Sequence, residues 1–115
     1  MIREYNKLIR DRIPEIIKKA GEKPLVRVLE DDVEYHKELM GKVMEEAREL
    51  YVAWARREGF VSELVDIQEL IDTILAEMGI SQLEFMELQR KKRVKRGGFK
   101  KRLFLIKTEA GPRSA

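Results

Sequence analysis

Two short acidic clusters fall within stretches of the sequence whose apolar spacing predicts helices. The first is Glu45, Glu46 and Glu49, and the second is Glu63 and Asp66. Residues three or four positions apart share one face of a helix, so the members of each cluster should point together. Carboxylates beside a buried apolar face are costly unless a positive charge accompanies them. The clusters therefore predict a bound cation.

The residue types available narrow the choice of cation. The sequence has no cysteine and a single histidine, His36, so neither a thiolate site nor a zinc or di-iron site with histidine ligands is supported. Mg²⁺ and Mn²⁺ take oxygen ligands and suit a site of several carboxylates. We expect Mg²⁺, with Mn²⁺ as an alternative. The competing interpretation is that these glutamates only line solvated helix faces, as Glu-rich helices often do by chance.

Four helices are expected to position these side chains. Pro14 can begin a short helix over 14–20. Asp31 or Asp32 is expected to cap a long helix that ends near Arg57, before Gly59. Ser62 is the expected cap of a helix that ends at Gly79. Ser81, with Glu84 at the capping-box position, is the expected start of a last helix that ends at Gly97 and Gly98.

The remaining patterns complete an expected fold that is mostly α. Runs over 23–29 and 99–107 are typical of strands and predict a short two-stranded β element. The helices predict an antiparallel bundle in which the two acidic clusters face each other. We expect one helical domain over residues 1–108 and a flexible tail over 109–115.

Composition sets the broad class of the protein. The chain has 115 residues, of which 43% are hydrophobic and 39% charged, with a net charge of +3. No apolar run is long enough to span a membrane, and no signal peptide is visible, so we expect a cytoplasmic protein without a membrane partner. A fold with so few helices and strands cannot cover all of its apolar faces. We therefore expect a homodimer or a homotetramer.

The acidic motif also carries a resemblance to a known family. Glu45-Glu46-Ala47-Arg48-Glu49, followed by Glu63-Leu64-Val65-Asp66, resembles the Glu-Glu-x-x-Glu … Glu-x-x-Asp signature of the all-α nucleoside triphosphate pyrophosphohydrolases, the MazG superfamily. The opening over 5–17 and the basic Gly-Gly-Phe ending over 95–99 look like its small house-cleaning branch, often labelled phosphoribosyl-ATP pyrophosphohydrolase-like.

The resemblance implies hydrolysis of a nucleoside triphosphate to the monophosphate and pyrophosphate. It implies Mg²⁺ held by Glu46, Glu49, Glu63 and Asp66, with Glu45, Glu46 and Glu49 in catalysis. Glu45 either binds a second ion or orients water. Val65 precedes Asp66 where the phosphoribosyl-ATP branch more often has alanine, which disfavours the histidine-biosynthesis substrate without excluding it.

Basic residues crowd the segment 90–102. Part of this charge interacts favourably with the end of the last helix. Lys92, Arg93 and Arg96 are the expected ligands of the substrate phosphates, and Lys7 and Arg10 in the opening segment are further candidates. Nucleic-acid binding is disfavoured because no aromatic residues interleave with the basic ones and because the acidic stripe would repel a strand. A non-catalytic nucleotide-binding or regulatory helical module remains the alternative to an enzyme.

Overall fold

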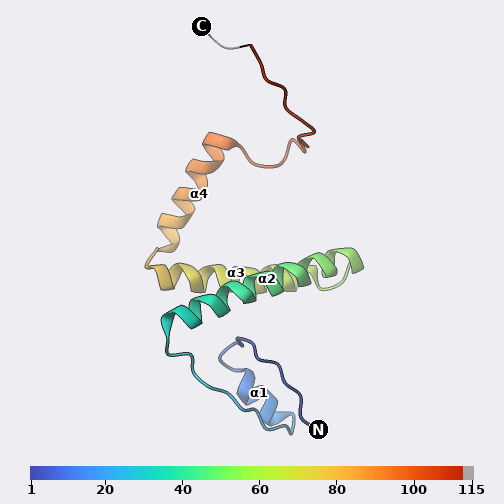
Figure 1. The fold of residues 1–115 in the computed structure, drawn as a ribbon, viewed down its shortest axis with the longest axis vertical. Coiled ribbons are helices and arrows are strands. Elements are labelled where there is room, and N and C mark those ends of the chain that lie inside the picture. The colour runs from blue at the N-terminus through green and yellow to red at the C-terminus, as the bar shows by residue number, and fades with distance from the viewer. Residues whose placement is uncertain (113–115) are drawn as a thin grey trace. The chain divides into compact units, whose positions relative to one another are not determined.

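The computed structural model describes residues 1–112, and these residues form four helices (Figure 1). The helices are α1 (Ile13–Lys19), α2 (Asp32–Arg56), α3 (Phe60–Met78) and α4 (Gln82–Arg96). The expected mostly α fold class is confirmed. No helix in this part of the chain is long and apolar enough to cross a membrane. Of the expected tail, residues 109–112 are irregular and 113–115 lie outside the described residues.

The expected two-stranded β element is wrong for the described residues. Both 23–29 and 99–107 lack strand structure, and most of their residues are exposed, including a fully exposed Leu25. A two-stranded sheet is marginal in water unless other elements cover one of its faces. The β-branched composition of these runs was not sufficient without such a cover.

Helices α2 and α3 pack against each other (Figure 1). The Asp31 side chain accepts a hydrogen bond from the Glu34 backbone N–H and caps α2. Of the two expected caps, Asp31 and Asp32, the first is therefore confirmed. Arg57 and Gly59 both take left-handed backbone conformations in the connection. These two residues reverse the chain in a short turn, so that α3 returns along α2.

Helix α3 begins three residues earlier than the sequence predicted, because its N-cap is Gly59 and not Ser62. Its N-cap is Gly59, with φ of 72°, and no side chain caps it, so the expected cap at Ser62 is wrong. The left-handed turn at Gly59 leads directly into helical backbone, so the helix already exists before Ser62 is reached. Glu63 consequently lies in the first turn of α3, where a negative charge is favoured by the helix dipole.

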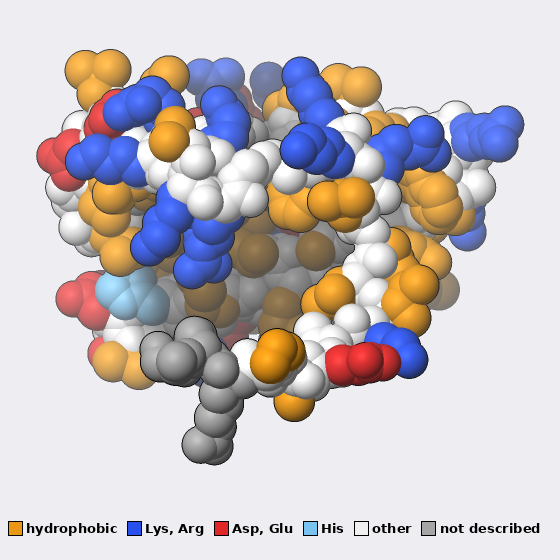
Figure 2. Space-filling view, turned by 90° about the horizontal axis from the view of Figure 1, so that it is seen from above, with side chains coloured by type: hydrophobic (Ala, Val, Ile, Leu, Met, Phe, Trp, Pro, Cys, Tyr) orange, Lys and Arg blue, Asp and Glu red, His pale blue; other side chains and the backbone are white. Residues whose placement is uncertain are grey.

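The chain divides into two units, Met1–Gly79 and Ile80–Ala115, which we describe separately. In the first unit, Leu39 and Ala53 of α2 and Leu75 of α3 are buried. In the second, Ser81 accepts a hydrogen bond from the Glu84 backbone N–H, which confirms the expected cap of α4. Helix α4 has no buried residue. Hydrophobic side chains therefore reach the surface beside Lys and Arg side chains, as on the face drawn in Figure 2.

Candidate metal centre

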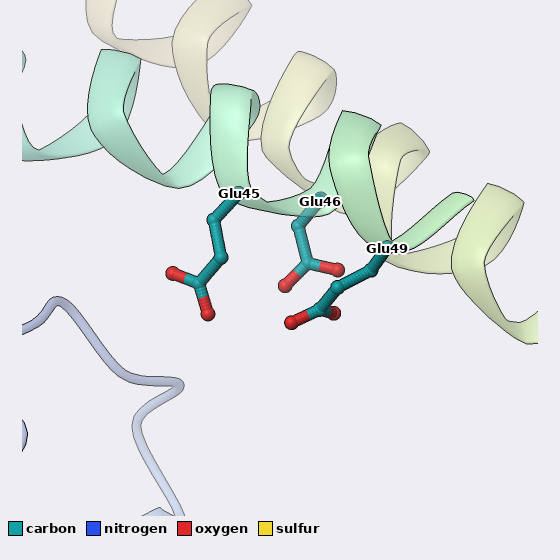
Figure 3. A group of neighbouring side chains, drawn as sticks. All are labelled: Glu45, Glu46 and Glu49. Carbon is teal, nitrogen blue, oxygen red and sulfur yellow. The ribbon is translucent and has the colours of Figure 1, made fainter. Parts of the chain in front are cut away.

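The two acidic clusters form one continuous site on α2 and α3. Glu45, Glu46 and Glu49 each offer a carboxylate oxygen, and these three atoms lie within 4.8 Å of one another. They project from the same side of α2 (Figure 3). A second group, within the same limit, joins Glu46 to Glu63 and Asp66 of α3. Glu46 belongs to both groups, so it connects the five carboxylates.

Glu46 is also the most deeply buried charged residue of the site. It is only 7% exposed, and it is the one buried polar residue among those described. Its Oε2 atom and Oε2 of Glu63 are both buried and without a hydrogen-bond partner in this part of the chain. A buried carboxylate oxygen without a partner bears the full cost of its desolvation. These two oxygens therefore require a proton or a cation.

Burial and neighbouring carboxyl groups raise the pKa of Glu46 from its usual 4.5 to about 7. Burial is the largest cause, because it penalises the charged form. Contacts with the carboxyl groups of Glu63 and Glu49 come next, followed by the negative charge of Asp66. Without a cation, Glu46 thus holds a proton to nearly neutral pH.

Cations from the N-terminal segment reach the site from outside α2 and α3. Arg10 Nη2 lies 2.5 Å from Asp66 Oδ1, and Lys7 Nζ lies 3.5 Å from Glu45 Oε1. Both basic residues are candidates for phosphate ligands from the sequence. The structure brings them to the carboxylates, and their contact with a substrate remains a prediction. Each pair is partly exposed, so its contribution to stability is modest.

Lys42 is a member of the site that the sequence analysis missed. Its Nζ lies 3.4 Å from Glu45 Oε2 and 3.7 Å from Glu46 Oε1, and its side chain is mostly buried. Its spacing of three and four residues from these glutamates was a visible signal for contact on a helix face. Lys42 compensates part of the negative charge, but it does not reach the unpartnered oxygens of Glu46 and Glu63.

The three basic residues expected from α4 belong to the second unit. Lys92, Arg93 and Arg96 lie in the last two turns of that helix, and all three are exposed. Their role in phosphate binding remains a prediction. His36, the single histidine, is exposed, and its Nε2 lies 3.2 Å from Glu77 Oε1.

The donor set fits a hard divalent cation. All five candidate ligands are carboxylates, and two of their oxygens are buried without partners. Oxygen ligands of this kind suit Mg²⁺ or Mn²⁺. Glu46, Glu49, Glu63 and Asp66 could hold such an ion, next to the contact of Arg10 with Asp66 Oδ1.

Comparison with known proteins gives one partial similarity. An uncharacterized protein of Mycolicibacterium smegmatis is 49% identical over 49 residues, which are 43% of this chain and 49% of that protein. The aligned segment thus spans about half of that relative's length. No family model matches the chain, and no solved structure matches it.

Proposed function

We propose that this chain is a Mg²⁺-dependent nucleoside triphosphate pyrophosphohydrolase, with Mn²⁺ as an alternative ion. The observation that supports this proposal most strongly is the pair of buried, unpartnered oxygens of Glu46 and Glu63 at the centre of five carboxylates. The resemblance of the Glu45–Glu49 and Glu63–Asp66 motifs to the MazG superfamily supplies the reaction. Such an activity fits a role in cleaning the cytoplasmic nucleotide pool.

In this proposal Glu46, Glu49, Glu63 and Asp66 hold Mg²⁺. The ion supplies charge neutralisation at the phosphate oxygens and lowers the pKa of bound water. Lys42 fixes the Glu45 and Glu46 side chains on α2 through its two contacts. Arg10 and Lys7 exchange their carboxylate partners for substrate phosphates, which guanidinium and ammonium groups bind well.

The reaction adds water across the bond between the α and β phosphates. The water oxygen bonds to phosphorus, the bridging bond breaks, and the products are the nucleoside monophosphate and pyrophosphate. Glu45 is our candidate for accepting the water proton, because it is half-buried and lies beside two of the four ligands, Glu46 and Glu49. No covalent nucleophile is needed, since positioning and charge stabilisation supply most of the acceleration.

A non-catalytic helical module is the second candidate, and one observation favours it. Lys7, Arg10 and Lys42 already pair with Glu45, Asp66 and Glu46, as purely structural carboxylates would. Such a module does not explain why the Oε2 atoms of Glu46 and Glu63 are buried without a hydrogen-bond partner. Turnover separates the two candidates: the enzyme releases pyrophosphate from a nucleoside triphosphate in the presence of Mg²⁺, whereas the module releases none.

We further propose that the active form is a homodimer or a homotetramer. Trp54 and Tyr51 are 63% and 67% exposed, although their rings contact each other on α2. Large aromatic residues on a surface are typical of protein interfaces. Among the described residues, the apolar side chains of α4 are likewise not buried. Light scattering on the purified protein tests this assembly.

A further inference from the structure

An open hollow of about 440 Å³ adjoins the carboxylate clusters near the end of α2. Glu49 and Glu63 line it and also belong to the clusters. The other lining residues combine two apolar side chains with three charged ones: Val52, Ala53, Arg48, Arg56 and Glu58. A molecule bound at the candidate ligands thus has a continuous path into this hollow.

The two arginines of the hollow differ from three other arginines that carboxylates hold in place. Arg10, Arg27 and Arg90 each form an ion pair with a carboxylate. Within residues 1–112, Arg48 and Arg56 form no ion pair and no side-chain hydrogen bond. Their guanidinium groups therefore keep all their donors available for a ligand, and a phosphate group can accept two of them at once.

Spacing along α2 separates these donors. Arg48 immediately precedes Glu49, whereas Arg56 lies two turns further on, about 12 Å along the helix axis. Such a separation suits an extended ligand with several anionic groups better than a single small anion. Val52 and Ala53 lie between the arginines and give that part of the wall an apolar surface, which strengthens charge interactions beside it.

We propose that Arg48 and Arg56 bind the polyphosphate chain of the substrate, with Arg48 beside the reacting phosphates and Arg56 beside those further away. This inference rests on the proposed hydrolase function and adds two phosphate ligands to it. Three carboxylates of the hollow outnumber its two guanidinium groups. Polyphosphate binding is therefore weak until a divalent cation neutralises Glu49 and Glu63. Glu58 opposes the phosphates under either condition.

The test is calorimetric titration of the full chain with inorganic tripolyphosphate, at constant free Mg²⁺ and again in EDTA. The wild-type protein should bind only with Mg²⁺. Arg48→Gln and Arg56→Gln should each raise the Kd about 10-fold, as expected for one charge-assisted contact. The Kd of Arg48→Lys should lie between those of Arg48→Gln and wild type, because lysine keeps the positive charge but cannot donate two parallel hydrogen bonds as a guanidinium group does. Glu58→Gln should lower the Kd.

Lys37→Gln is the matched control, since Lys37 is an exposed residue of α2 outside the hollow. This variant removes one positive charge and should leave the Kd for tripolyphosphate within about twofold of wild type. A loss of affinity equal to that of the arginine variants would mean that only net charge matters and would overturn the inference. Circular dichroism checks that each variant keeps its helices. Wild-type protein that binds no tripolyphosphate with Mg²⁺, or arginine variants that bind it unchanged, would also overturn the inference.

Pyrophosphate release, measured on the same proteins, separates this inference from the proposed function. Turnover with an unchanged KM in both arginine variants would remove Arg48 and Arg56 from the site and leave the hydrolase standing. Arginine-dependent tripolyphosphate binding without any turnover would leave the phosphate site standing and remove the hydrolase.

Discussion

Arg10 and Asp66 are 56 positions apart in the sequence, yet their side chains form an ion pair at 2.5 Å. This contact ties the N-terminal segment to α3 at a carboxylate that we propose as a metal ligand. Guanidinium and metal both draw on the negative charge of this one carboxylate, so each weakens the binding of the other. In our proposal, Arg10 stabilises the metal-free protein and binds the substrate phosphates when the metal is present.

Replacement of Arg10 should therefore change metal binding and substrate binding in opposite directions. We expect Arg10→Gln to bind Mg²⁺ severalfold more tightly without substrate, because the competing cation is gone. The same variant should show a KM for nucleoside triphosphate about 10-fold higher, because a phosphate ligand is lost. Calorimetry measures the first effect and steady-state kinetics the second.

Arg27→Gln provides the control for that experiment. Arg27 pairs with Glu34 at 2.7 Å, so this change also removes an arginine from an exposed ion pair, but away from the carboxylate site. Both constants should remain near their wild-type values in this variant. Parallel shifts of the two constants in Arg10→Gln would contradict the exchange of partners.

The pKa of Glu46 predicts how the stability of the metal-free protein depends on pH. Because this pKa rises from 4.5 to about 7 on folding, the native state binds more protons than the unfolded state between these values. The free energy of unfolding in EDTA should thus fall as pH rises from about 4.5 through 7, and then level off. Thermal melts should show this decrease for wild type and a flatter profile for Glu46→Gln.

Metal affinity should change with pH in the opposite direction. The proton on Glu46 must leave before its carboxylate can bind a cation, so Mg²⁺ affinity should increase as pH rises through about 7. Titrations at pH 6 and pH 8 measure this difference. Equal affinities at the two values would indicate that Glu46 is not a ligand.

Exposed aromatic residues of α2 predict self-association. We expect Trp54→Lys to shift the homodimer or homotetramer toward the monomer. The indole is 63% exposed in one chain, and the change would replace this apolar ring with a charged group at the proposed interface. Light scattering across a concentration series measures the mass of wild type and variant. A wild-type protein that stays monomeric at high micromolar concentration would remove the proposed assembly.

Local signals predicted the helices and the carboxylates of the site, but not the basic residues that contact those carboxylates. Asp31, Ser81 and Gly79 were recognisable as helix boundaries because capping depends on neighbouring residues only. The facing of Glu46 and Glu63 followed from periodicity and a short connection. The pairing of Arg10 with Asp66 could not be predicted, since no period relates residues so far apart. The expected strands failed for a related reason, because a strand requires a partner that its own sequence does not specify.

The most direct test of the proposed function measures the products released from a panel of canonical and modified nucleoside triphosphates with Mg²⁺. We predict monophosphate and pyrophosphate in equal amounts from at least one member. Glu49→Gln and Asp66→Asn should each lower this turnover by about 100-fold or more. Glu69→Gln, which alters an exposed carboxylate one turn beyond Asp66, should leave it unchanged. Turnover that survives both ligand substitutions, or no turnover across the panel, would contradict the hydrolase.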